Sequence, residues 1–291
     1  MLALDSVSVR IGAATLLDGL SLSVASGEVV AIVGPNGAGK STALRVLAGE
    51  MAPTAGRALL DGAPLADAAP EALAQRRAVL PQHSALAFGF TALDVVLLGR
   101  TPHATSRTAD LDAAERAMRR AGVLPLAARR VPTLSGGEQQ RVHLARTLAQ
   151  LDARGEERMA SGDGVPASHQ TRHLLLDEPT SALDLAHQHA VLRVAREEAA
   201  RGTGVLAVLH DLNLAAQYAD RIAVLAGGQL VALGAPEAVL TPTVVRCAFG
   251  ISVLVTQNPC AACPLVVPIP GEDAGDDLFA PLPVLGVSLE P

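Results

Sequence analysis

One segment of the sequence combines glycines with a lysine at a spacing that is typical of phosphate binding. It fits the pattern GxxxxGK[ST] and comprises Gly34, Pro35, Asn36, Gly37, Ala38, Gly39, Lys40, Ser41 and Thr42. Glycines let backbone N–H groups close around phosphate oxygens, and a helix that begins there adds the positive end of its dipole. In this pattern the lysine reaches the β- and γ-phosphates, and the Ser41 hydroxyl binds Mg²⁺. We therefore expect residues 34–42, the phosphate loop, to bind a nucleotide.

Two acids, Asp177 and Glu178, directly follow an apolar run at residues 174–176. In α/β sheets ligands bind at the carboxyl ends of the strands. Asp177 is therefore expected to hold Mg²⁺, directly or through water, and Glu178 to polarise an attacking water. Two acids at a strand end are a weak signal alone, because they are equally compatible with an exposed turn. Their position after a phosphate loop makes nucleotide hydrolysis the stronger interpretation.

A third segment indicates another anion site at a helix N-terminus. Its residues are Leu134, Ser135, Gly136, Gly137 and Glu138, followed by QQR. Ser135 is a good helix N-cap, and the two glycines leave the first-turn N–H groups open. One nucleotide does not need two such sites from one chain, whereas two chains that face each other do.

The elements that must position these residues alternate along the chain. Residues 29–33 form a continuous apolar run, which fits a strand buried on both faces of a parallel sheet. Further strands are expected at 2–9, 20–24, 173–176, 204–209 and 221–226, and helices at 41–48, 110–121, 135–151, 184–200 and 212–218. This alternation predicts an α/β fold with a parallel sheet.

Three stretches depart from that pattern. Residues 51–80 suggest turns and short strands, because prolines and glycines separate short apolar pieces. Residues 152–171 are polar and indicate a surface insertion rather than a domain boundary. After about residue 256 the chain is Pro-rich, and we expect an irregular extension over 256–291.

The composition excludes several classes of protein. A net charge of −6 and 2% aromatic residues disfavour a nucleic-acid binder. No apolar run approaches the ~20 residues of a membrane span, and the N-terminus lacks signal-peptide features. Three cysteines do not suggest a disulfide scaffold. Cys260 and Cys263 form a CxxC pair without a second pair, so free thiols are a simpler interpretation than a metal site.

Together these motifs resemble those of the ATP-binding cassette (ABC) family of transporter ATPases. GPNGAGKST resembles the family's Walker A loop, LSGGEQQR its signature motif and LLLDEP its Walker B motif. Gln82 in LPQHS resembles the Q-loop glutamine, residues 181–184 the D-loop, and His210 in VLHDLN the switch histidine. The resemblance covers residues 1–255. It implies a phosphate-loop NTPase fold with a RecA-like parallel-sheet core, an N-terminal antiparallel β-subdomain and a helical signature subdomain at about 82–150.

The resemblance also implies ATP and Mg²⁺ as ligands and a head-to-tail homodimer. Each ATP would lie between the phosphate loop of one subunit and the signature motif of the other. His210 would contact the γ-phosphate and hold the attacking water with Glu178, while Gln82 would sense the γ-phosphate and Mg²⁺. Asp184 of the D-loop would link the two sites. His187 and His189 follow it, and we expect both to be exposed.

One position departs from the family pattern. The family has an aromatic residue that stacks on adenine near the end of the first strand, and here Ile11 stands at that place. Either adenine rests on an aliphatic contact or Arg10 stacks on it.

The stretch VLPQHSALAFGFTALDVVLLGRTPH resembles ATPases of iron-chelate, heme and vitamin B12 importers. With the polar insertion and HDLNLAAQYADRI, it most resembles the heme importer ATPase, and siderophore and cobalamin importers are the alternatives. This implies two transmembrane permease subunits, a periplasmic substrate-binding protein and a place on the cytoplasmic face of the inner membrane. A soluble ABC protein of translation or DNA repair is disfavoured, because the chain has one cassette and no sustained heptads. The ATPase of a separate export permease is a third alternative.

Overall fold

The computed structural model describes residues 1–82, 89–152, 171–181 and 183–273 of the chain. It consists of two compact units, residues 1–66 with 206–291, and residues 67–205. Apart from its two end residues, the polar insertion expected at 152–171 lies outside the described part. Among the described residues, no helix is both long and apolar enough to cross a membrane.

The first unit begins with an antiparallel sheet, as the N-terminal alternation of apolar residues indicates. Its strands lie in the order β2-β1-β4-β5, with bounds β1 (Leu2–Ile11), β2 (Ala14–Val24), β4 (Ala55–Leu60) and β5 (Ala63–Pro64). Leu2, Leu4, Val7 and Val9 of β1 are buried, but Ala3 is buried as well and the pairing with β2 shifts between Leu4 and Val7, so the alternation is interrupted.

The same unit contains the strand that leads into the phosphate loop. β3 (Val29–Val33) is buried at every residue and pairs in parallel with β9 (Arg221–Ala226), which pairs antiparallel with β10 (Gln229–Gly234). Its helices are α1 (Lys40–Leu47), α8 (Leu212–Tyr218), α9 (Pro236–Val239) and α10 (Pro242–Phe249). The chain thus turns directly from β3 through the phosphate loop into α1, as predicted.

The C-terminal part of the first unit contains a hairpin of β11 (Ile251–Gln257) and β12 (Pro264–Asp273). The irregular structure predicted from residue 256 onward is therefore wrong for β12. Its prolines fit an edge strand, and Val266 supplies a buried apolar anchor. The Asn213 side chain of α8 bonds the Val266 N–H (2.8 Å) and C=O (3.2 Å), which fixes the hairpin to α8.

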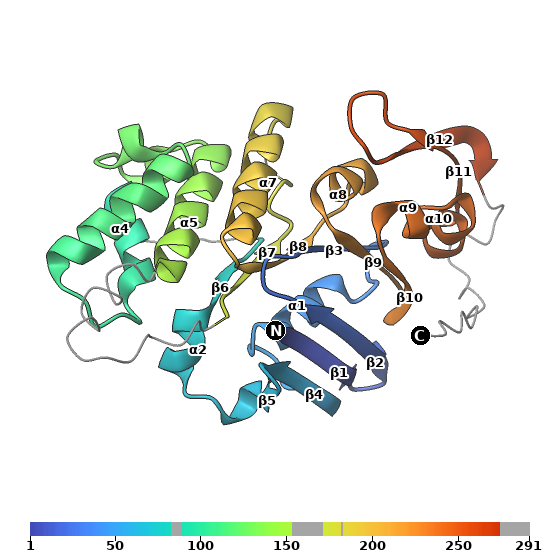
Figure 1. Cartoon of the computed structure of the whole chain (residues 1–291), viewed down its shortest axis with the longest axis horizontal. Helices are drawn as coiled ribbons and strands as arrows, with labels where there is room; N and C mark the ends of the chain where they lie inside the picture. Colours follow the sequence, from blue (N-terminus) through green and yellow to red (C-terminus); the bar gives the residue numbers. More distant parts are fainter. Residues whose placement is uncertain (83–88, 153–170, 182, 274–291) are drawn as a thin grey trace. The chain divides into compact units, whose positions relative to one another are not determined.

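The second unit is mainly helical (Figure 1). Its elements are α2 (Pro70–Arg76), β6 (Arg77–Leu80), α3 (Ala92–Leu97), α4 (Arg107–Arg120), α5 (Gly136–Leu151), β7 (His173–Asp177) and α7 (Leu185–Ala200), with short 3₁₀ turns η1 (Leu65–Asp67), η2 (Leu98–Arg100), η3 (Leu124–Leu126) and η4 (Val131–Thr133) around them. β6 and β7 pair in parallel, and the boundary between the units falls within β8 (Gly204–Val208). The structure confirms the α/β class with parallel strands, whereas the sequence missed helix α2.

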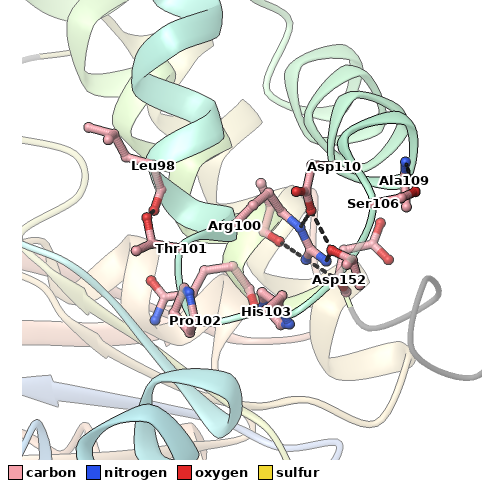
Figure 2. Close-up of polar contacts among 12 residues, drawn as sticks. Leu98, Arg100, Thr101, Pro102, His103, Ser106, Ala109, Asp110 and Asp152 are labelled. Carbon is pink, nitrogen blue, oxygen red and sulfur yellow. Dashed lines mark hydrogen bonds and ion pairs between the residues drawn. The ribbon is translucent and has the colours of Figure 1, made fainter. Parts of the chain in front are cut away.

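A buried polar cluster holds the C-terminal end of α5 (Figure 2). The Arg100 side chain is only 3% exposed, and its guanidinium donates to the carbonyls of Ala149 (2.8 Å) and Asp152 (2.5 Å) and to Asp110 Oδ1 (3.0 Å). Nearby, His103 Nε2 lies 2.7 Å from the Gln150 carbonyl. These contacts satisfy carbonyls that the end of a helix leaves open.

Candidate nucleotide site

The phosphate loop has the glycine-dependent backbone that the sequence predicts. Gly39 has φ +95°, and a Cβ there would lie 2.6 Å from the Leu16 carbonyl oxygen. At Gly34 a Cβ would lie 2.1 Å from the Leu225 carbonyl oxygen. Only glycine fits at either position, so the loop can remain tightly curled ahead of α1.

Lys40 begins α1 and is buried within the loop, with 5% of its surface exposed. Its ammonium donates to the carbonyls of Gly34 (2.7 Å) and Pro35 (2.8 Å). The N-cap of α1 is Gly39, so no side chain caps the first-turn N–H groups. A held ammonium beside uncapped helix amides fits the phosphates of a nucleotide.

The acid pair stands at the end of a strand, as expected. β7 ends at Asp177, and Glu178 follows with φ +48°, a left-handed conformation that is unusual for a residue with a Cβ. Gln82 Nε2 donates to Glu178 Oε2 at 2.5 Å, although 96 residues separate the two in the chain. The structure therefore brings the Q-loop glutamine and the candidate catalytic glutamate into direct contact.

Asp184 is the N-cap of α7, because its carboxylate accepts from the His187 N–H at 2.9 Å. His187 Nδ1 lies 2.7 Å from the same oxygen. These hydrogen bonds, with the backbone one as the larger cause, hold the pKa of Asp184 below its ordinary value. His187 and His189 are both half-buried, so the expectation that both are exposed is wrong.

The signature segment ends in a capped helix start. Ser135 is the N-cap of α5: its hydroxyl accepts from the Glu138 N–H (3.3 Å), and its own N–H donates to Glu138 Oε2 (2.8 Å). The pKa of Glu138 is lowered, and the largest cause is the hydrogen bond from the Ser135 N–H to its carboxylate. Leu134 is buried, while Ser135 and Gly136 are exposed. The predicted anion site is thus open at its surface.

The predicted site residues divide between the two units. The phosphate loop, Ile11 and His210 belong to the first; Gln82, the signature residues 134–138, Asp177, Glu178 and Asp184 belong to the second. His210 lies after β8 and immediately before Asp211, which caps α8. Ile11 is 58% exposed at the end of β1, so it is accessible for a contact with a base.

The two cysteines of the CxxC pair differ in exposure. Cys260 is exposed, Cys263 is buried, and both are free thiols. Among the described residues, no group of three or more His, Cys, Asp and Glu side chains could hold a metal ion.

One set of side-chain contacts between the acid pair and α7 could not be predicted from the sequence. Gln188, on the first turns of α7, donates from Nε2 to the carbonyls of Thr180 (3.2 Å) and Leu183 (3.1 Å). A glutamine three positions after a helix start carries no local signal of such a role, because its acceptors are backbone atoms of the preceding turn.

A phosphate loop entering a helix, an acid pair at a strand end and a second glycine-rich helix start define a nucleotide-binding protein of the phosphate-loop class.

The family model for ABC transporters matches residues 17–152. The chain is 51% identical to the hemin import ATP-binding protein HmuV of Gloeobacter violaceus over 92% of its own length and 94% of that protein's. It is also 51% identical to HmuV of Deinococcus radiodurans, over 90% of this chain and 94% of that protein. The dimeric structure of MJ0796, a bacterial ABC transporter cassette, matches with a TM-score of 0.67 and 27% identity over 81% of this chain and 98% of that one. The chain therefore belongs to the family of ABC transporter ATP-binding proteins.

Proposed function

We propose that this chain is the ATP-hydrolysing subunit of an ABC importer that energises the uptake of heme across the inner membrane. The observation that carries the proposal is 51% identity, over 92% of the chain, to a protein named for hemin import. The Walker A, Q-loop, signature, Walker B, D-loop and switch motifs all follow in the family order, which supports an active ATPase rather than a degenerate one.

The residues of the site have distinct roles in this proposal. Residues 34–42 bind the ATP phosphates, with Lys40 on the β- and γ-phosphates. The candidate ligands of Mg²⁺ are Ser41, Gln82 and Asp177. Their hydroxyl, amide and carboxylate oxygens suit a hard cation. A bound Mg²⁺ would neutralise charge on the phosphates. Glu178 accepts a proton from the attacking water, and His210 orients that water beside the γ-phosphate.

The assembly we propose is a homodimer. Residues 134–138 of one subunit face the ATP held by the other subunit, and Asp184 links the two sites. The dimer lies on the cytoplasmic face of the inner membrane, bound to two transmembrane permease subunits that receive heme from a periplasmic binding protein. A relative solved as a dimer of cassettes is compatible with this arrangement.

Uptake by the reconstituted importer tests the substrate. The chain and its permease are placed in proteoliposomes, and ATP-dependent transport of heme is compared with that of a ferric siderophore and of cobalamin. We expect heme alone to be transported. Uptake of a siderophore or of cobalamin without heme would assign the chain to a different importer, and outward movement would indicate an exporter.

A single substitution tests the hydrolytic site separately. Glu178→Gln removes the proton acceptor, and we expect it to abolish turnover while ATP binding and dimer closure persist. The matched control is Glu115→Gln, which alters an exposed carboxylate on α4. Undiminished hydrolysis by Glu178→Gln would contradict the role given to this residue.

A further inference from the structure

The turn between Glu178 and α7 begins from a strained backbone. Glu178 has φ +48°, a left-handed conformation that is unfavourable for a residue with a Cβ. Such strain persists only where the surrounding contacts fix the backbone. The position of the Glu178 carboxylate therefore depends on what holds the turn.

Backbone and hydroxyl bonds hold the first half of that turn. The Ser181 N–H (3.3 Å) and hydroxyl (3.1 Å) both donate to the Glu178 carbonyl. The Leu183 N–H donates to the Thr180 carbonyl at 3.3 Å. All three of these bonds join residues of the turn to one another, so they do not fix the turn to helix α7.

One side chain bonds both ends of the turn from outside it. The two hydrogens of the Gln188 amide nitrogen reach the carbonyls of Thr180 and Leu183, at 3.2 and 3.1 Å. Because Gln188 is fixed on α7, it ties the turn to the helix that Asp184 caps. The clamp therefore sets the spacing between Glu178 and Asp184.

We propose that Gln188 is a positioning residue for ATP hydrolysis: by binding the carbonyls of Thr180 and Leu183, it keeps Glu178 and Asp184 at a fixed spacing. This inference rests on the proposed function, because it assumes that Glu178 activates water. Gln188 does not touch the nucleotide in this scheme. It acts through Glu178, whose carboxylate also accepts a hydrogen bond from Gln82.

The test compares two isosteric variants with a matched control. Gln188→Met keeps the volume and removes both donors, and Gln188→Glu places a carboxylate against two carbonyl oxygens. A Glu near the N-terminal end of α7 is compatible with the helix dipole, so that helix should not be weakened. Gln217→Glu makes the same chemical change at an exposed position of α8.

We expect kcat for ATP to fall about 10- to 100-fold in both Gln188 variants, since small misplacements of a catalytic group have effects of this order. The KM for ATP, the ATP affinity and the melting temperature should stay near those of Gln217→Glu. In Gln188→Glu, kcat should partly recover as pH is lowered from 8 to 5.5, because a protonated carboxyl again donates to a carbonyl. Gln188→Met should show no such recovery.

The outcomes separate this inference from the function on which it rests. An unmodified chain without ATPase activity would contradict the proposed function. An active chain whose kcat is unchanged by both Gln188 substitutions would overturn the clamp. A fall in ATP affinity and in melting temperature together with the fall in kcat would also overturn it, since it would indicate a purely structural role.

Discussion

The two ends of helix α5 are held in opposite ways. At its start, Ser135 and Glu138 bond each other, and nothing lies within 4 Å of where a Cβ of Gly136 would be. At its end, the buried guanidinium of Arg100 binds carbonyls that are 49 and 52 residues away in sequence (Figure 2).

The difference separates function from stability along one helix. The start satisfies its hydrogen bonds locally, so its outer surface stays free for a ligand. The end is fixed by distant segments: Gln150 Nε2 donates to the carbonyls of Ala74 (2.8 Å) and Arg77 (3.1 Å), just before the segment that leads to Gln82. Substitutions at the start should therefore affect turnover, and those at the end should affect folding.

The largest effect is expected at the open start. Among the described residues, nothing lies within 4 Å of a Cβ at Gly136, so Gly136→Asp has room for its Cβ. The substitution adds a negative charge at a helix N-terminus, where it should not destabilise the fold. The same carboxylate would repel the triphosphate of a partner-bound ATP, and like charges in an interface cost several kcal/mol. We expect ATP turnover to fall at least ~100-fold with an unchanged melting temperature.

Gly136→Asn is the control for Gly136→Asp, because it has the same size without the charge. Its turnover should remain closer to that of the unmodified chain. If both variants melted earlier and lost turnover together, the separation of the two ends of α5 would be refuted.

The second effect is expected at the buried end. Arg100→Met keeps a long side chain and removes the guanidinium, which leaves the Asp110 carboxylate and two helix-end carbonyls without that partner. Breaking a buried charge pair costs about 3–5 kcal/mol. The free energy of unfolding in urea should fall by that amount.

Arg119→Met is the matched control on the neighbouring helix, since the Arg119 side chain is 67% exposed. It should change the free energy of unfolding by less than about 0.5 kcal/mol. Equal effects of the two substitutions would show that the end of α5 is not a stabilising centre.

This contrast also explains what could be predicted from the sequence. The start of α5 could be predicted because Ser135 is a favoured N-cap residue directly before the helix, whereas its pairing with Glu138 is seen only in the structure. The apolar runs that became β3, β7 and β9 were likewise read from neighbouring residues. Arg100 and Gln188 were not assigned roles, because their acceptors are backbone carbonyls that only the folded chain brings to them.

The errors have the same origin. Prolines in 264–273 suggested irregular structure, whereas pairing with β11 makes this segment an edge strand. Helix α2 was missed although Pro70 stands at its first position, a favoured place for proline that local reading could have used. For the nucleotide site, the motifs predicted the residue types and their strand ends, but not the contact between Gln82 and Glu178.

The third effect concerns the buried middle of α5 and depends on pH. His143 is 4% exposed, and burial, followed by the charge of Arg146, lowers its pKa from 6.5 to about 4. The folded state therefore favours neutral His143, and the unfolded state binds a proton first as the pH falls. The contribution of neutral His143 to the free energy of unfolding is fully present above pH 6.5. It falls by about 3 kcal/mol as the pH is lowered to 4.

His143→Leu tests that pH dependence, because leucine is apolar, of similar size and has no group that binds a proton. Chemical denaturation between pH 7 and 4 should show a shallower loss of stability in this variant. A pH slope equal to that of the unmodified chain would mean that other groups cause it.

The smallest effect is expected from the cap at the start of α5. Ser135→Ala removes the hydroxyl that accepts from Glu138 N–H, and loss of such a cap costs about 1 kcal/mol. Ser106→Ala is a matched change, because Ser106 caps α4 through the Ala109 N–H in the same way. In urea, the free energy of unfolding should fall by a similar amount in both variants. Only Ser135→Ala should also lower ATP turnover, since only that helix start belongs to the proposed nucleotide site.

A similar loss of turnover in Ser106→Ala would show that weakening any cap of this unit impairs hydrolysis. The two ends of α5 would then not differ in function.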